Sequence, residues 1–210
     1  MSWCKMLANR SCGNSRVYRL IQTRVDKTSL WSRDCIKSLK SISEFGLKGD
    51  HGKAKVLIVG YGNPLRSDDA IGLVAADNLS AIPSIACDSS IEIIKCHQLM
   101  PELSEKIANS DFVIFIDAAA ASQGDYPGSL NSFEIEFDPK SSVTLGHHCT
   151  PSELVSFSVA LLGGRPKALA VSLTAASFDY GETLTEAVQG GISPLIEFIT
   201  TQIREFRRSD

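Results

Sequence analysis

The sequence predicts an α/β protein with a five-stranded sheet that is mostly parallel, has one antiparallel edge strand, and is covered by helices on both faces. Three observations predict this fold class. Short apolar runs alternate with helical patterns from Ala54 onward, the connections are short, and the strongest run is apolar on both faces, as buried parallel strands are. A chain of 210 residues, of which 43% are hydrophobic, can bury the core that such a sheet needs.

The first expected strand, residues 56–60, leads into a turn and then into a helix. The two glycines of the turn suit a backbone that is crowded or left-handed. Helical spacing resumes behind two adjacent carboxylates, Asp68 and Asp69, and predicts a helix over residues 69–80 with one apolar face. In an open α/β sheet, ligands and reacting groups collect at this carboxyl end of a strand.

The next elements repeat the alternation of strand and helix. Residues 91–95 are expected to form a strand, and Pro101 suits the first turn of a helix that ends near position 108. Residues 112–117 form the most strongly apolar strand, which stops at a carboxylate, Asp117.

Residues 130–137 are expected to form the strand at the edge of the sheet. Their alternation predicts that Phe133, Ile135 and Phe137 point inward and that the glutamates between them point outward. The remaining expected elements are a helix over residues 150–162 that Gly163 closes, a strand over residues 168–174, one helical turn capped by Thr183 or Thr185, and a final helix that Ser193 and Pro194 open.

Residues 1–53 differ from the rest of the chain. Up to Lys55 there are 12 Lys and Arg against 4 Asp and Glu, whereas the remainder has 9 against 20. We expect residues 1–53 to be a poorly ordered basic extension and residues 54–210 to form the α/β domain. The Ser- and Arg-rich composition suggests an organelle transit peptide, but the four acidic residues argue against one. A disordered tail and an extension upstream of the true start are the alternatives.

Composition also excludes some classes of partner. The acidic body is not typical of a nucleic-acid-binding protein, and no apolar run approaches the roughly 18 to 20 residues needed to span a bilayer. The six cysteines show no CxxC pair, which predicts reduced thiols and a cytoplasmic location. These cysteines are Cys4, Cys12, Cys35, Cys87, Cys96 and Cys149.

Three polar features stand where strands or turns should end at one edge of the sheet. They are the pair Asp68 and Asp69, Asp117 at the end of its strand, and His147 with His148 just before a helix. A carboxylate that ends a buried apolar strand is costly to bury without a partner, and a metal site is one solution. Two carboxylates and one imidazole suit a borderline divalent ion such as nickel or zinc.

Each feature also has a structural alternative. Asp69 could cap a helix and Asp68 could stabilise its dipole, while Asp117 could accept backbone hydrogen bonds in a loop. Adjacent histidines are more often solvated or packed than ligands. The conjunction of all three at predicted strand ends favours a site over any one of these alternatives.

Three further side chains point less clearly to the same cleft. His97 and Glu102 flank the turn after the second strand and could line it, with a surface role as the alternative. Cys149 follows the histidines, but catalytic Cys/His pairs meet in space rather than in sequence, so we interpret it as incidental.

Residues 60–72, Gly-Tyr-Gly-Asn-Pro-Leu-Arg-Ser-Asp-Asp-Ala-Ile-Gly, resemble the opening motif of the hydrogenase maturation proteases, the endopeptidases that process the large subunit of nickel–iron hydrogenases. Four later segments resemble the family's motifs in the same order and spacing, so that the resemblance covers about residues 54–203. They are Gln98-Leu-Met-Pro-Glu-Leu103, Phe115-Ile-Asp117-Ala-Ala, Gly146-His-His-Cys-Thr-Pro-Ser-Glu-Leu154 and Gly181-Glu-Thr-Leu-Thr.

The resemblance implies a compact three-layer α/β/α protein with a twisted sheet between its helices. It implies an enzyme that removes the C-terminal peptide of the hydrogenase large-subunit precursor after nickel has been inserted. The family's catalytic, metal-contacting positions fall on Asp69, Asp117 and His147, with His148 as the reserve. The nickel belongs to the substrate, and no organic cofactor is implied.

In the mechanism that the resemblance implies, these three side chains complete the coordination of nickel that precursor cysteines already hold. A metal-polarised carbonyl or a carboxylate-activated water then allows hydrolysis of the peptide bond. The chain departs from the family in two respects. Asp69 is one methylene shorter than the Glu of many relatives, and the first 53 residues have no counterpart.

Three other functions are compatible with parts of the sequence. A non-catalytic module that checks the precursor for nickel would need the same three ligands, and a peptidase of this architecture could act on another substrate. A nucleotide-binding domain could use the glycine-rich turn. It is less favoured, because Leu65 stands where a dinucleotide fingerprint has its third glycine.

Overall fold

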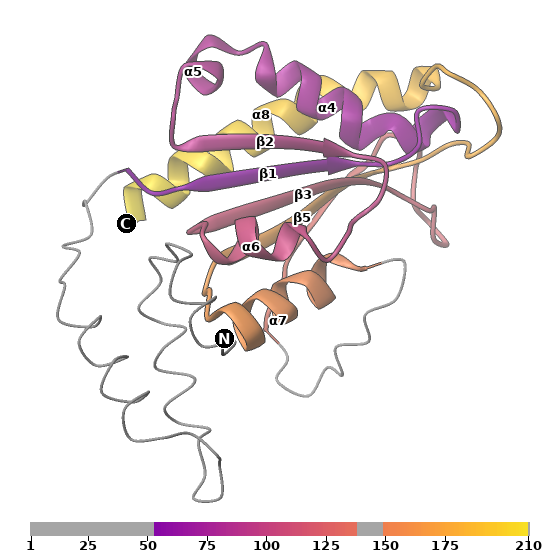
Figure 1. Ribbon diagram of the computed structural model, residues 1–210. Helices are drawn as coiled ribbons and strands as arrows, with labels where there is room; N and C mark the ends of the chain where they lie inside the picture. Colours follow the sequence, from indigo (N-terminus) through magenta and orange to yellow (C-terminus); the bar gives the residue numbers. More distant parts are fainter. Residues whose placement is uncertain (1–52, 138–148, 210) are drawn as a thin grey trace, which may run out of the picture. The chain divides into compact units, whose positions relative to one another are not determined.

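Five strands form one sheet in the order β2-β1-β3-β5-β4, and helices cover both of its faces (Figure 1). The computed structural model describes residues 53–137 and 149–209. The strands are β1 (Val56–Tyr61), β2 (Ile91–Cys96), β3 (Phe112–Ala119), β4 (Leu130–Glu134) and β5 (Lys167–Thr174). The helices are η1 (Ser67–Ala70), α4 (Ile71–Ser80), α5 (Pro83–Ala86), α6 (Leu103–Ala108), α7 (Pro151–Leu162) and α8 (Glu186–Ser209). The predicted N-terminal extension lies outside the described residues, apart from Lys53.

The strand order reverses between β1 and β3. The chain moves from β1 to β2 on one side and then crosses to β3 on the other side, so that Val56 of β1 pairs with both Ile91 and Phe112. All of these pairs are parallel, as is β3 with β5, and only β4 pairs in the antiparallel sense. The predicted fold class, a mostly parallel sheet with one antiparallel edge strand, is confirmed.

The core consists of two apolar layers, one on each face of the sheet. Successive side chains of a strand point to opposite faces, so Ile58 packs with α4 and α8 whereas Leu57 and Val59 pack with α6 and α7. Figure 1 shows α4 and α8 above the sheet and α6 and α7 below it. Burial on both faces explains why β1 and β3 are continuous apolar runs rather than alternating ones.

The start of α4 lies unusually close to β1 and β3. A Cβ atom on Gly72 would lie 2.3 Å from the Tyr61 carbonyl oxygen and 2.4 Å from that of Ile116. The first turn of α4 can therefore pack against two strands at once only with glycine at position 72. This contact explains why the motif of residues 60–72 ends on one.

Gly72→Ala should destabilise the fold by about 3 kcal/mol, since either the helix or the strands must move to admit the methyl group. Gly190→Ala is the matched control. That position lies in a helix with no atom within 4 Å of a new Cβ, so the change should be neutral or stabilise by up to about 1 kcal/mol. Urea unfolding measures both. Equal stabilities of the two variants would contradict the packing described here.

The final helix differs from its prediction. It begins at Glu186 and contains Pro194 in its interior, instead of starting there. Proline removes a hydrogen bond to the carbonyl of Gly190, but burial of apolar residues on both sides of it outweighs this loss. The buried positions of α8 recur at spacings of three and four: Val188, Gly191, Leu195, Ile199 and Ile203.

The edge strand also differs in part. It ends at Glu134, and the expectation that both phenylalanines point inward is wrong: Phe133 is 59% exposed and Phe137 is 42% exposed. Ile135 alone of the three packs into the core, with side chains of α7. The alternation identified the faces of the strand, but the helix layer covers only part of this edge.

The helix predicted over residues 150–162 is confirmed with its caps. The Thr150 hydroxyl accepts a hydrogen bond from the Glu153 amide, and the Glu153 carboxylate accepts one from the Thr150 amide, so the two form a capping box. Gly163 ends the helix in the left-handed region, with φ of 71°. In the two described ranges of the chain, no helix has the length and apolar composition to cross a membrane.

Candidate active site

The candidate active site lies where β1 and β3 end, at the point where the strand order reverses. The two strands pair in register as far as Gly60 and Ile116, so the next residues, Tyr61 and Asp117, stand side by side. The Tyr61 hydroxyl lies close enough to the Asp117 carboxylate for each group to affect the pKa of the other. Open α/β sheets bind their ligands outside such a switch point.

The turn after β1 returns Asp69 to the same edge. Gly62 has φ of 139°, and a Cβ atom there would lie 1.8 Å from the Asp69 carbonyl oxygen, so the turn requires glycine. The Asn63 amide donates a hydrogen bond to Asp69 Oδ2 at 2.9 Å. The N-terminus of α4 has no side-chain cap, so Asp69 does not serve as a helix cap.

Asp69 is close enough to Asp117 for its charge to affect the pKa of the Asp117 carboxyl group. Burial raises the pKa of Asp117 to about 6; hydrogen bonds from Tyr61 and from the Ala118 amide oppose the rise, and the Asp69 charge adds to it. Burial, followed by the Asp117 charge, raises the pKa of Tyr61, which stays a neutral donor. A carboxyl group with a pKa near 6 is mostly ionised at neutral pH and still basic enough to accept a proton.

Asp68, the neighbour of Asp69, has a structural role. Its fully buried carboxylate accepts hydrogen bonds of 2.7 to 3.0 Å from the amides of Ala176 and Ser177 and from the amide and hydroxyl of Thr185. Burial acts to raise the pKa of Asp68, but these hydrogen bonds outweigh it and lower the pKa below its usual value. The predicted pair therefore divides into one residue that holds the fold and one that faces the site.

The third predicted position lies outside the described residues. Both His147 and His148 fall in the segment 138–148, so the choice between them stays a prediction. Within residues 53–137 and 149–209, no three His, Cys, Asp or Glu side chains are grouped closely enough to hold a metal ion. The structure places the two predicted carboxylates near each other, and the metal site itself stays a prediction.

The remaining candidates lie near the turns that flank the site. His97 Nδ1 is 3.2 Å from the Gly62 carbonyl oxygen, so its ring contacts the turn that carries Asp69. Burial raises the pKa of Cys149, and the nearby carboxylates of Glu153 and Glu102 raise it further. A thiol with a raised pKa is a weak nucleophile, which agrees with the interpretation of Cys149 as incidental.

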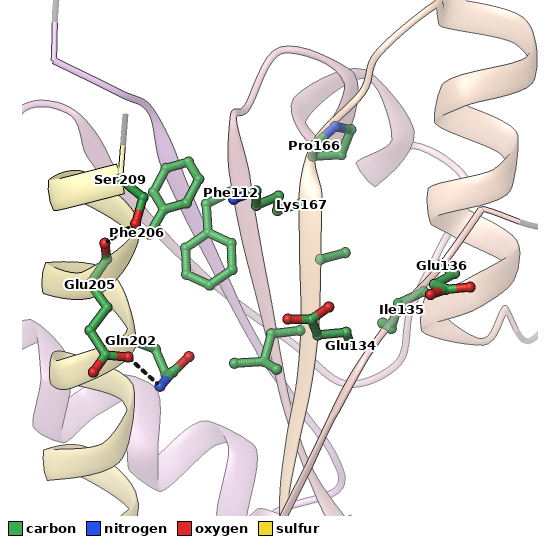
Figure 2. Close-up of a pocket in the computed structure, with 12 residues that line it drawn as sticks. Phe112, Glu134, Ile135, Glu136, Pro166, Lys167, Gln202, Glu205, Phe206 and Ser209 are labelled. Carbon is green, nitrogen blue, oxygen red and sulfur yellow. Dashed lines mark hydrogen bonds between the residues drawn. The ribbon is translucent and has the colours of Figure 1, made fainter.

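A groove of about 440 Å³ lies at the opposite ends of the strands from the candidate active site, where β3 and β5 begin (Figure 2). Its lining includes Phe112 and Phe206, whose stacked rings have centroids 4.7 Å apart, together with Glu134 and Glu205. None of the predicted site residues that the structure describes lines it. The groove is therefore separate from the candidate active site.

Sequence reasoning missed two partners of the site. Tyr61 stands between the glycines of the first motif, and only the pairing of β1 with β3 reveals that it meets Asp117. The sequence predicts Thr185 only as a possible cap of a helical turn, but it is instead the main partner of Asp68, with two of the four hydrogen bonds. In both cases the sequence offered a hint, because a polar residue stands inside a motif. The sequence does not show which carboxylate that residue meets in the folded protein.

The fold and the site together define an α/β/α protein with two interacting carboxylates at the switch point of its sheet. No protein-family model matches the chain, and no curated protein matches it. The same fold occurs in solved structures that this chain covers almost completely, including three named proteases. The hydrogenase maturating endopeptidase HybD from E. coli is 24% identical, with a TM-score of 0.55 over 72% of this chain and 93% of that chain.

The other two structures agree with the first. The nickel–iron hydrogenase maturation protease HycI from Thermococcus kodakarensis is 22% identical, with a TM-score of 0.57 over 73% of this chain and 95% of that chain. An endopeptidase from Escherichia coli, solved in solution, is 25% identical, with a TM-score of 0.54 over 74% and 99%. These comparisons confirm the resemblance drawn from the motifs and give the chain the fold of the hydrogenase maturation endopeptidases.

Proposed function

We propose that this protein is an endopeptidase that removes the C-terminal peptide of a nickel–iron hydrogenase large-subunit precursor after nickel insertion. The observation that carries the proposal is the meeting of Asp69 and Asp117 at the switch point of a sheet whose fold is that of named endopeptidases. The described cysteines, Cys87, Cys96 and Cys149, are free thiols, which supports a reducing, cytoplasmic location for the reaction.

In this proposal Asp69 and Asp117 offer oxygen ligands to nickel that arrives with the substrate, and His147 supplies the imidazole. Asp117 has a second possible task, because its pKa of about 6 suits a general base that activates water beside the scissile bond. The Tyr61 hydroxyl would hold the Asp117 carboxylate in place during either task. Polarisation of the carbonyl by the metal is the alternative route.

A nucleotide site at the same turn is not favoured. The Asn63 amide, which a phosphate would need, already donates to Asp69 Oδ2. The negative charge of that carboxylate would also repel a phosphate bound to this turn. The turn is therefore built around its own carboxylate rather than around an external anion.

The test is incubation of the full chain with nickel-loaded and with nickel-free large-subunit precursor, followed by intact mass. We expect only the loaded precursor to become shorter, and the reaction to be lost in His147→Ala, with His148→Ala as the comparison. Binding of the loaded precursor without shortening would favour a nickel-checking module instead. If several nickel-loaded precursors are neither bound nor shortened, the proposed substrate is wrong.

A further inference from the structure

Two loops lie against each other beside Asp69, and we call them the loop pair: residues 63–68, before α4, and residues 176–185, before α8. The Ser67 amide donates to the Gly181 carbonyl at 2.8 Å, and the Gly181 amide donates to the Leu65 carbonyl at 3.0 Å. The buried Asp68 carboxylate joins the same two loops with four further hydrogen bonds.

The conformation of Ser67 indicates that the loop pair is held rigidly. Its φ of 45° lies in the left-handed region, which costs a residue other than glycine some free energy unless its surroundings fix it. Here the Ser67 hydroxyl donates to the Asp179 carbonyl at 3.1 Å, and the Ser67 amide is bound as described above. A surface carried on such a loop is pre-organised for binding.

Leu65 and Tyr180 are large apolar side chains that this rigid support leaves on the surface. Leu65 is 44% exposed and Tyr180 is 83% exposed. Their backbones are neighbours, because the Leu65 carbonyl accepts a hydrogen bond from the residue that follows Tyr180, and Arg66 and Gly181 form a parallel bridge. Single exposed apolar residues are common, but two together on a fixed loop indicate a binding surface.

A short series of hydrogen bonds joins this patch to the candidate active site. The Leu65 amide donates to Asn63 Oδ1 at 2.9 Å, and the Asn63 amide donates to Asp69 Oδ2 at 2.9 Å. Whatever Leu65 and Tyr180 contact is therefore placed at a fixed offset from the Asp69 carboxylate. Positioning of this kind is what a peptidase needs to bring one bond of a long chain to its reacting groups.

We propose that Leu65 and Tyr180 form a docking patch for an apolar segment of the large-subunit precursor, next to the bond that is cut. This inference rests on the proposed function. A stable dimer buries about 800 Å² on each partner, which is far more than two exposed side chains can offer. The occupant is therefore the substrate chain that the carboxylates act on.

The test compares Leu65→Ala, Tyr180→Ala and the double variant with the wild type, using nickel-loaded precursor. We expect KM to rise about 10-fold in each single variant and more in the double variant, with kcat changed less than about 3-fold, because the patch binds substrate and leaves the reacting groups in place. The thermal midpoint should stay the same, since both side chains are exposed.

Leu161→Ala is the matched control. Leu161 is 53% exposed near the end of α7, which leads to the start of β5, the edge opposite the candidate site. An unchanged KM in the double variant, or an equal rise for Leu161→Ala, would overturn the patch while leaving the proposed function in place. If the wild type binds precursor without cutting it, the dissociation constant replaces KM. If it neither binds nor cuts, the proposed function and the patch both fail.

Discussion

Replacing Asp117 by Asn should abolish processing of the precursor and at the same time make the protein more resistant to heat. The Asn side chain keeps an oxygen for the hydrogen bonds from Tyr61 and the Ala118 amide, so the fold should persist. It lacks the charge that would bind the substrate metal or accept a proton. We expect the rate of processing to fall at least about 100-fold, as for loss of a catalytic acid or base.

The gain in stability follows from the raised pKa of Asp117. Its folded-state pKa is about 6 and its unfolded value is near 4, so folding penalises the ionised form. The protonated form stabilises the wild type fully below pH 4, and this stabilisation is lost as the pH rises through 6. Above pH 6 the penalty amounts to no more than about 3 kcal/mol, and Asn does not have it.

Thermal unfolding at several pH values checks this expectation. The Asn variant should melt several degrees above the wild type at pH 7 and within about one degree of it at pH 4. Asp77→Asn is the control, because Asp77 is an exposed partner of Lys95 and should change neither property. A difference in melting temperature that grows on acidification would show that the Asp117 environment has been assigned wrongly.

Substitutions of the two adjacent carboxylates, Asp68 and Asp69, should have different effects: the first should lower stability, and the second should abolish activity. Asp68→Ala leaves the amides of Ala176, Ser177 and Thr185 without their acceptor in a buried place, and should cost about 3 to 5 kcal/mol. Asp69→Ala removes an acceptor of one backbone amide, that of Asn63, and should cost about 1 kcal/mol, yet it should abolish processing.

Urea unfolding and the precursor assay together distinguish these effects. Folding lowers the pKa of Asp68, so its ionised carboxylate stabilises the folded state at neutral pH. This stabilisation is lost only as the pH falls below about 4, the pKa of an Asp in the unfolded chain. Asp68→Asn keeps one acceptor oxygen and should lie between the wild type and Asp68→Ala. Similar unfolding free energies for Asp68→Ala and Asp69→Ala would contradict the division of roles.

Most of the fold could be predicted from the sequence because buried parallel strands and amphipathic helices leave strong local patterns. The boundaries of β1 and β2 were predicted to within one residue. The errors arose where tertiary packing outweighs a local signal. Pro194 is a strong start signal, but burial extends α8 eight residues before it, and Phe133 alternates as a core residue at an edge that the helices do not cover.

The candidate site could be predicted only in part. Asp117 stood out because a carboxylate that ends a buried apolar strand is costly to bury without a partner, and Asp69 because it follows the turn after the first strand. The structure places the two carboxylates near each other. Tyr61 could not be found this way, since its role depends on the register of two strands distant in sequence. The histidines lie beyond the described residues, and their role stays a prediction.

The position of the site between β1 and β3 also determines when it can form during folding. Val56 pairs with Phe112, and Phe112 pairs with Lys167, so the central pairs of the sheet join residues far apart along the chain. Such long-range pairing gives a high contact order and slow folding. Because Tyr61 meets Asp117 only after the central strands have paired, a partly folded chain has no assembled site. Recovery of activity during refolding should therefore coincide with the slowest structural phase.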